Sequence, residues 1–313
     1  MSWQNFQTLT LSPHNPSAAR PRFSLTSDII GFRHCARQYG YFSHNGFVPA
    51  QAAQTFYGQV IHQVLDRCHR HFSGLIHGVA AGSLPTDQEV AAYFDEVQTA
   101  LRAHGVRPAS LQMSTQALQV IKTFNRVEGH TLYPRVLDTE YRLEADQQNY
   151  VLRGVVDVLA GSAIGEREIW DYKGSEMPPL GSDRMRDYEW QMSVYAHLYR
   201  VKSGSYPTHA VLYFLNELRA PAGTAPPTTR PLRAVHTVEF MRDGVQADGT
   251  PTLVYNGLQA FGQTVQDILA CKGTQQWPHP MGQNIPDDRS CNICDIRWSC
   301  PSRTGHYPPR YPL

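Results

Sequence analysis

Long apolar runs are absent from this sequence. Its longest are short, strand-like stretches such as 154–160, far below the roughly 20 residues that a membrane-spanning helix needs. The opening residues Met1 to Gln4 lack the positive charge and the apolar segment of a secretion signal. We therefore predict neither a membrane span nor a secretion signal, and we expect a cytoplasmic protein.

Excess charge is also missing. The 28 Lys and Arg residues nearly balance 27 Asp and Glu, for a net charge of +1. The field of the whole protein therefore cannot attract nucleic acid, so any such binding must come from local patches. The phosphate-binding pattern GxxxxGK(S/T) does not occur, which excludes ATP hydrolysis through a P-loop. A helicase or recombination partner, if one is needed, would be another chain.

Repeats and low-complexity tracts are absent too. The chain has 313 residues, of which 41% are apolar, and this suffices for a full core. Apolar spacing predicts helices over 27–41, 50–72, 86–103, 110–130, 182–201 and 252–271, and strands over 135–143, 150–160, 168–172, 209–215 and 234–240. This order predicts an α/β fold with a mixed central sheet, flanking helices and an added helical region.

Two of the predicted strands carry acidic groups that could act together. Asp157 lies in an apolar strand, and Asp171 lies in the next one. Because side chains alternate along a strand, Lys173 shares a face with Asp171. Two carboxylates on neighbouring strands can hold a divalent cation, and a nearby lysine can contact the attacking water or the scissile phosphate. Either carboxylate alone would be an ordinary surface group, but the combination indicates metal-assisted phosphodiester hydrolysis.

Four short motifs occur in the order known from one group of nucleases. They are Gly58-Gln59-Val60-Ile61-His62, Gly154-Val155-Val156-Asp157, Asp171-Tyr172-Lys173 and Gln191-Met192-Ser193-Val194-Tyr195. The sequence thus resembles the PD-(D/E)XK nucleases of the RecB/AddB type over about residues 24–301. The resemblance implies that Asp157, Asp171 and Lys173 are catalytic. It implies metal ligation by His62, Asp157, Asp171 and the backbone carbonyl of Tyr172.

The expected metal is Mg²⁺ or Mn²⁺. A helical histidine taken alone is usually an ordinary hydrogen-bonded residue, but His62 beside two carboxylates would favour Mn²⁺, because nitrogen ligands suit transition metals. Gln191 and Tyr195 lie four residues apart, on one helical face. The resemblance places them beside the active site as DNA-binding residues, and ordinary helix packing is the alternative. Glu140 lies in the strand before the first acidic strand. It is interpreted as solvated or structural, and approach to the site is the alternative.

The six cysteines are clustered in a way that favours metal binding over disulfides. Cys291, Cys294 and Cys300 lie within ten residues, and Cys35 is the natural fourth ligand. This spacing resembles the iron–sulphur staple of AddB-type and CRISPR-associated adaptation nucleases, which implies a 4Fe–4S cluster. A structural Zn²⁺ with the same four ligands stays open as the alternative. The two remaining cysteines, Cys68 and Cys271, are predicted to be buried fillers.

Basic and aromatic residues surround these cysteines. Arg33 and Arg37 lie near Cys35 on the first predicted helix, with Tyr39 and Tyr41 close by. Arginines can pair with phosphates and rings can stack on bases, so this composition suits single-stranded DNA. A solvated helix face with core aromatics is the alternative. We interpret Arg33 and Arg37 as DNA-binding residues.

The resulting hypothesis is a metal-dependent deoxyribonuclease, more an exonuclease than an endonuclease, that acts on single-stranded DNA or DNA ends in repair, recombination or CRISPR adaptation. Two alternatives are a catalytically silent scaffold that binds DNA ends and a zinc-stabilised RNA-binding module. We predict an irregular arm (1–23), a single stapled nuclease domain (24–301) and a tail (302–313). Within the domain, 50–130 is mainly helical, 131–272 is the catalytic α/β core and 273–301 binds the cluster.

Overall fold

The computed structural model describes residues 20–46, 53–161, 165–221, 223–281, 286, 291–292 and 294–303. Most of the predicted arm, most of the predicted tail and residues 50–52 of the second predicted helix lie outside these ranges. No helix in the described ranges is both long and apolar enough to cross a membrane.

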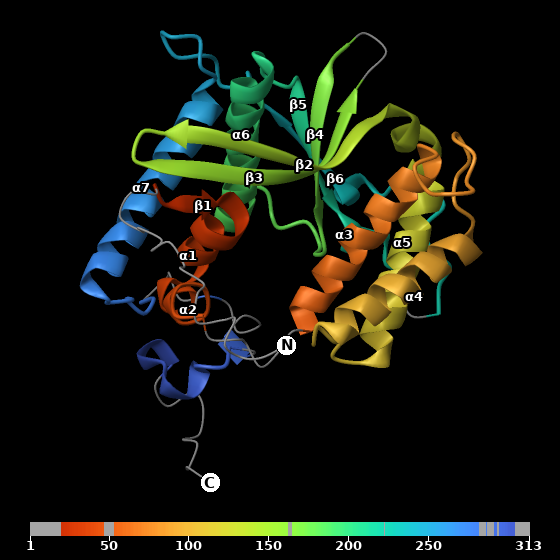
Figure 1. Cartoon of the computed structure of the whole chain (residues 1–313), viewed down its shortest axis with the longest axis horizontal. Coiled ribbons are helices and arrows are strands. Elements are labelled where there is room, and N and C mark those ends of the chain that lie inside the picture. The colour runs from red at the N-terminus through yellow and green to blue at the C-terminus, as the bar shows by residue number, and fades with distance from the viewer. Residues whose placement is uncertain are drawn as a thin grey trace, which may run out of the picture.

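A mixed sheet of six strands forms the centre of the molecule (Figure 1). The strands are β1 (Arg22–Ser24), β2 (Val136–Gln147), β3 (Tyr150–Gly161), β4 (Arg167–Lys173), β5 (His209–Phe214) and β6 (Val235–Glu239). Their order is β1-β3-β4-β5-β6, and β2 pairs with β3 outside this path. The pairs β1–β3 and β4–β5 are parallel, and the other pairs are antiparallel. The predicted mixed α/β sheet is confirmed, except that β1 was expected to be irregular.

Seven α-helices and several short turns surround this sheet in the described ranges. The helices are α1 (Gly31–His34), α2 (Ala36–Tyr39), α3 (Ala53–Phe72), α4 (Asp87–Ala103), α5 (Leu111–Leu132), α6 (Asp183–Ser203) and α7 (Thr252–Thr274). Serine or threonine begins three of them. Thr86 and Glu89 form the predicted capping box of α4, while Ser110 and Ser182 cap α5 and α6. Each cap satisfies a backbone N–H that the first helical turn leaves free.

Two hydrophobic cores lie on the two faces of the sheet. One is built around α6 and α7, and includes Met192, Tyr195 and Phe261. The other is built around α3, α4 and α5, and includes Val64 and Phe124. Figure 1 shows these two groups of helices on opposite sides of the sheet. The helical region predicted from 50–130 therefore packs on the sheet rather than standing apart from it.

The helix predicted over 27–41 is interrupted, which corrects that expectation. A π-helical turn (Leu25–Ile30) leads into α1, and α1 ends at Cys35, whose backbone is extended with φ −163° and ψ 105°. A second helical turn follows, and then a π-helical turn over Gly40–His44. Glycines at 31 and 40 weaken helix propensity here, and tertiary packing determines the path. Cys35 thereby comes to line a cavity with three distant cysteines.

Candidate active site

A local irregularity of the β2–β3 ladder creates the centre of the site. Glu140 has a left-handed backbone with φ 49°, and the pair Glu140–Asp157 is missing from the register, which also shifts between Val136 and Asp138. On one side of this point Val156 packs into the core beside α6, and on the other Val158 packs into the core beside α3. Two residues that would lie on the same face of a regular strand therefore enter opposite cores, so the direction of the β3 side chains switches at Asp157. The carboxylate lies at the junction of the two cores.

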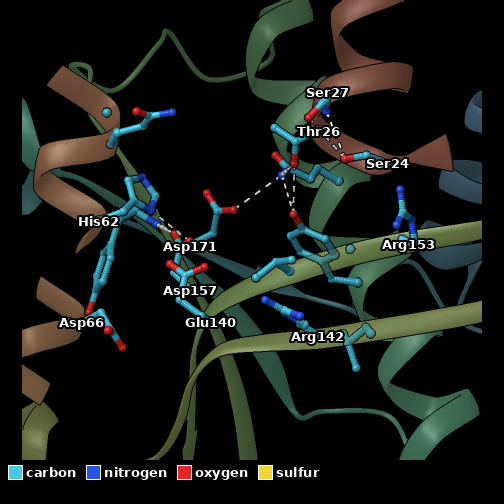
Figure 2. Close-up of a pocket in the computed structure, with 18 of the residues that line it drawn as sticks. Ser24, Thr26, Ser27, His62, Asp66, Glu140, Arg142, Arg153, Asp157 and Asp171 are labelled. Carbon is cyan, nitrogen blue, oxygen red and sulfur yellow. Dashed lines mark hydrogen bonds and ion pairs between the residues drawn. The ribbon is translucent and has the colours of Figure 1, made fainter. Parts of the chain in front are cut away.

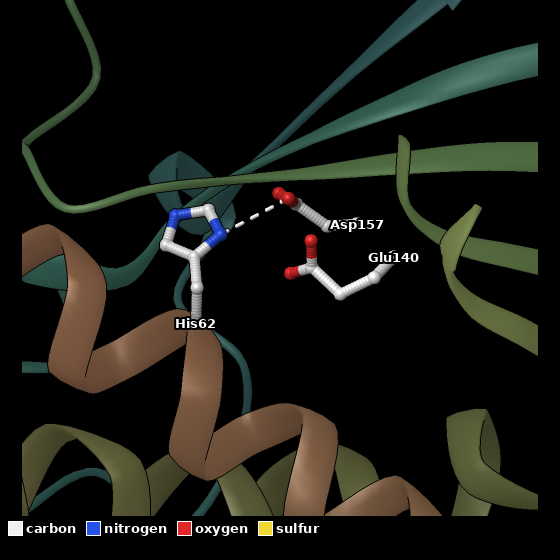
Figure 3. A group of neighbouring side chains, drawn as sticks. All are labelled: His62, Glu140 and Asp157. Carbon is white, nitrogen blue, oxygen red and sulfur yellow. Dashed lines mark hydrogen bonds and ion pairs between the residues drawn. The ribbon is translucent and has the colours of Figure 1, made fainter. Parts of the chain in front are cut away.

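Helix α3 brings His62 to this junction. His62 Nδ1 lies 3.0 Å from Asp157 Oδ1. Glu140 approaches the same point, and one donor atom from each of the three residues lies within 4.8 Å of the others (Figure 3). Glu140 therefore lies at the site, which agrees with the alternative considered for it rather than with its default interpretation as solvated or structural. Its left-handed backbone and its contacts with distant elements left no signal in the sequence.

The second carboxylate oxygen of Asp157 extends the site to β4. The β3–β4 ladder stops at the pair Val158–Trp170. Beyond it, the backbone N–H of Tyr172 donates to Asp157 Oδ2 at 2.6 Å. The phenol of Tyr172 lies 3.0 Å from Nε2 of buried His69 on α3. These contacts hold β4 against α3, and the role of the Tyr172 carbonyl as a metal ligand stays a prediction.

Asp171 and Lys173 form a close pair on β4. Lys173 Nζ lies 2.6 Å from Asp171 Oδ2 and donates to Gln191 Oε1 at 2.8 Å. The ammonium also sits 4.5 Å from the ring centroid of Tyr188. Asp171 is only 5% exposed and lies outside the group formed by His62 and its two acidic neighbours. The lysine is thus held by three neighbours, close to that group.

Helix α6 supplies the inner wall of the site. Gln191 and Tyr195 are each 1% exposed, and Gln191 Nε2 donates to the Tyr195 hydroxyl at 3.1 Å. The same hydroxyl lies 3.2 Å from Thr26 Oγ1. A Cβ at Gly154 would lie 2.5 Å from the Tyr195 ring, so the ring fits only because residue 154 is glycine. Direct contact of Gln191 and Tyr195 with DNA stays a prediction, since their polar groups face the catalytic side chains.

The electrostatics of the site show crowded negative charge in a poorly solvated place. Burial alone would lower the pKa of His62, but Asp157, Asp171 and Glu140 together raise it to about 9. Burial raises the pKa of Asp171, against the opposing effect of Lys173. Burial and the facing Asp157 raise the pKa of Glu140. A divalent cation would relieve this repulsion, and one imidazole with several carboxylates suits Mn²⁺ or Mg²⁺.

These residues line one open cavity of about 1160 Å³. Figure 2 shows His62 and Asp66 on α3 facing the β2–β3 hairpin across it, with Asp157 and Asp171 between them. The cavity continues past the acidic group along the hairpin, where Arg142 and Arg153 line it. A polymer could therefore reach the acidic group without any part of the described structure moving aside.

The four predicted cluster cysteines also converge. Cys35, Cys291, Cys294 and Cys300 line one small cavity. Burial raises the pKa of the Cys35 and Cys294 thiols, and the neighbouring cysteines raise it further. No three of these sulphur atoms, all within the described ranges, lie within 4.8 Å of one another. Of the two predicted fillers, Cys68 is buried as expected, whereas Cys271 is partly exposed.

Arg33 and Arg37 lie away from the acidic group, and neither lines its cavity. Arg33 pairs with Asp187 at 2.8 Å and lies over the ring of Trp190. Arg37 lies over the ring of Tyr41 and lines the cysteine cavity. Both side chains therefore have partners within the protein, and their contact with DNA stays a prediction.

The same segment of chain matches a known family. Residues 26–301 match the model of the PD-(D/E)XK nuclease superfamily. The chain belongs to the PD-(D/E)XK nuclease superfamily. Membership implies a nucleic-acid substrate and a divalent metal ion, for which the donor groups at the site are chemically suited. The match neither singles out the RecB/AddB type within the superfamily nor supports a metal cluster at the cysteines.

Two of the solved structures that match this superfamily member are distant in sequence. The protein SSO0001 is 10% identical, with a TM-score of 0.37, over 95% of this chain and 91% of its own. A protein from Eubacterium rectale, described as a "Putative exonuclease", is 14% identical, with a TM-score of 0.46, over 100% of this chain and 96% of its own. Neither likeness carries an argument at these scores. No curated protein matches the chain in sequence.

Proposed function

We propose that this chain is a divalent-metal-dependent deoxyribonuclease that acts on single-stranded DNA or DNA ends, more as an exonuclease than as an endonuclease. The observation that carries the proposal is the convergence of His62, Asp157 and Glu140 beside the Asp171–Lys173 pair in one open cavity. Structural carboxylates are usually neutralised by cations or dispersed in solvent. Here three acidic groups share a partly buried pocket with one histidine and one lysine.

The metal ligands would be His62, Asp157, Asp171 and the backbone carbonyl of Tyr172, to which we add Glu140. A bound divalent cation supplies hydroxide near neutral pH and neutralises charge on the phosphate. The chain itself orients part of this donor set. The Asp157 carboxylate is held by the Tyr172 N–H, whereas Glu140 reaches the site from the irregular point of the ladder with an exposed side chain. A preorganised ligand such as Asp157 loses little conformational freedom when the ion binds.

Lys173 would carry the chemical step from the protein side. Its ammonium can contact the attacking water or the scissile phosphate, where negative charge builds in the transition state. Gln191 Oε1 accepts a hydrogen bond from this ammonium, and Asp171 balances its charge. Gln191 is thus a positioning residue, because it acts through Lys173 rather than on the reacting atoms.

The test is an assay of purified protein on end-labelled single- and double-stranded DNA with Mg²⁺ or Mn²⁺. Asp157→Asn should abolish cleavage, because the amide keeps an oxygen for the Tyr172 N–H but loses the charge that a hard cation needs. The matched control is Asp95→Asn, since Asp95 is an exposed carboxylate on α4, away from the cavity. Wild-type protein that binds DNA ends but cleaves with neither metal would instead support the silent scaffold.

We further propose a 4Fe–4S cluster at Cys35, Cys291, Cys294 and Cys300. The support is the cavity that they share and their spacing along the chain, with three thiols within ten residues and one far away. Four thiolates can hold an iron–sulphur cluster, and a single tetrahedral Zn²⁺ with the same ligands is the alternative.

A further inference from the structure

The catalytic cavity has an extension that the chemistry of cleavage does not use. It continues over the outer half of the β2–β3 hairpin, where Arg153 and Val155 point to the same side of β3. Arg142 is paired in register with Val155, on the neighbouring strand. Figure 2 shows both arginines on the hairpin, across the cavity from His62.

The side chains of Arg142 and Arg153 are exposed, and within the described part of the chain they make no ion pair and no hydrogen bond. The charge of Arg142 acts on nearby Glu140, where it opposes the rise in the pKa of that carboxyl. Arg22 lines the same cavity but is neutralised by Glu144 at 3.0 Å. Two arginines on adjacent strands, beside a site that attracts a metal ion, form a place for an anionic ligand.

The opposite wall of the cavity has a different character. There α3 presents Thr55, Gln59 and Gln63, which are exposed, neutral and able to form hydrogen bonds. Ser24 and Ser27, at the start of the amino-terminal turn, lie on the side of the arginines (Figure 2). The cavity therefore has two unpaired arginines on the hairpin, beside the Arg22–Glu144 pair, and uncharged polar groups on α3 that lead to Asp66 near the acidic group.

We propose that this cavity holds one strand of DNA, with its phosphates along Arg142 and Arg153 and its bases toward Gln59 and Gln63. The inference rests on the proposed nuclease function and names the form of its substrate. A single strand has one phosphate backbone, which matches unpaired arginines on one wall, whereas a duplex would present phosphates to both walls. Arg153 lies four residues before Asp157, about 13 Å along the strand. The contacted phosphates therefore lie a few nucleotides from the scissile one.

The cavity offers little base stacking. Its aromatic side chains, Tyr172 and Tyr195, are 3% and 1% exposed. Binding should therefore depend on phosphate contacts, which makes it sensitive to salt and tolerant of base sequence. This separates the cavity from single-strand binders that use ring platforms.

The first experiment measures binding of labelled oligothymidylate in EDTA, by fluorescence anisotropy over a series of salt concentrations. Arg142→Ala and Arg153→Ala should each reduce the slope of log affinity against log salt by about 0.7, and the double variant by about 1.4. Arg142→Lys and Arg153→Lys should keep the slope. Arg126→Ala is the control, because it removes the same charge from α5, where Arg126 pairs with Asp87.

The second experiment compares substrates of different size with Mn²⁺ present. The arginine variants should lose far less kcat/KM with bis(p-nitrophenyl) phosphate than with oligothymidylate, since this small diester reaches the acidic group but not the hairpin. Only wild type should gain kcat/KM as oligothymidylate is lengthened. Circular dichroism and denaturant unfolding show whether the variants are folded.

The outcomes separate this inference from the function on which it rests. If wild type hydrolyses neither substrate, the nuclease proposal fails. A second outcome is that wild type hydrolyses both substrates, while Arg142→Ala and Arg153→Ala match Arg126→Ala in the salt dependence of affinity and in the dependence of kcat/KM on oligonucleotide length. In that case the proposed strand track, the path of the DNA strand along Arg142 and Arg153, is wrong and the nuclease proposal stands. Equal affinity for duplex and single strand, with the same loss of slope in the variants, would overturn the single-strand assignment.

Discussion

Oδ2 of Asp157 lies 2.6 Å from the backbone nitrogen of Tyr172. Asp157 is the first residue of β3 beyond the last β3–β4 pair, Val158–Trp170. A side chain thus takes the place of a strand-to-strand backbone bond. The same carboxylate faces His62 through its other oxygen. The position of β4, and with it that of Asp171 and Lys173, therefore depends on the group that we propose as a metal ligand.

Asp171→Ala and Lys173→Ala should both abolish cleavage, for different reasons. Loss of Asp171 removes negative charge from a hard-cation site, so Mn²⁺ binding should disappear or weaken greatly. Loss of Lys173 removes a like charge beside the metal, so Mn²⁺ binding should persist or improve slightly. Cleavage by Lys173→Ala should fall at least about 100-fold, as when an oxyanion donor is removed. Calorimetric titration with Mn²⁺ beside a cleavage assay distinguishes the two variants. Wild-type cleavage by Lys173→Ala would contradict the mechanism.

Glu140 offers a test that separates charge from backbone strain. Glu140→Gln should weaken Mn²⁺ binding, by roughly 10- to 100-fold if the carboxylate is a ligand or orients one. Glu140→Gly should weaken it similarly. Glycine removes the strain of a left-handed backbone, which costs a non-glycine residue about 1–2 kcal/mol in the folded state. Glycine also increases the conformational entropy of the unfolded chain, which offsets about half of this gain in stability. Its unfolding free energy in denaturant should therefore be at or slightly above that of wild type. Unchanged metal affinity in both variants would remove Glu140 from the site.

Gln191 and Tyr195 should affect catalysis without affecting metal binding. Gln191→Ala removes one of the two oxygen partners of the Lys173 ammonium, so kcat should fall while Mn²⁺ affinity stays. Tyr195→Ala should also weaken activity, and it additionally opens a void beside Gly154. Tyr195→Phe keeps the ring and should retain most activity. Parallel loss of activity and thermal stability in Gln191→Ala would show that its role is packing alone.

Burial of His69 should make the protein sensitive to acid. Desolvation lowers its pKa from 6.5 to about 3. Below pH 6.5 this histidine becomes protonated in the unfolded chain but stays neutral in the folded chain. The free energy of unfolding therefore decreases as the pH falls toward 3, by at most about 1.4 kcal/mol per pH unit. His69→Gln can keep the bond to Tyr172 and does not titrate. Denaturant unfolding from pH 4 to 7 should show a flatter profile for this variant, and identical profiles would contradict the assignment.

Metal analysis tests the cysteine cavity. Anaerobically purified protein should contain iron and sulphide and absorb broadly near 400 nm, roughly as thiolate-bound iron does. Cys35→Ala should lose the metal and destabilise both ends of the described chain, whereas Cys271→Ala, outside the cavity, should not. One zinc per chain without iron would exclude the cluster while keeping the four ligands. A stable, metal-loaded Cys35→Ala protein would exclude Cys35 as a ligand.

Local sequence signals predicted most of the fold. Apolar periodicity identified the long helices and the strands from β2 onward, because those elements bury one face or both. It missed β1, which has three residues and exists only through its pairing with β3. It also missed the break at Cys35, which tertiary packing imposes on a segment of short helical turns.

The site was predictable where a motif places a side chain on a regular element. Short motifs identified His62 on α3 and both acidic strands. Glu140 could be named only as an alternative, because its left-handed backbone and its approach to His62 arise from contacts between residues far apart in the sequence. For Arg33 the sequence showed a cation near a cysteine, but not the distant Asp187 that pairs with it. Long-range pairing of charges leaves no periodic trace along the chain.

The positions of the cysteines along the chain also bear on how the protein is made. Cys35 is synthesised before α3, whereas Cys291, Cys294 and Cys300 follow α7. Every residue proposed for the metal site and the strand track lies between these ends. The catalytic cavity can therefore assemble on the ribosome before the two ends of the staple meet. A chain that ends before Cys291 would contain every residue of the acidic centre but only one of the four cavity cysteines. The cysteine cavity can therefore close only after the residues of the acidic centre have been synthesised.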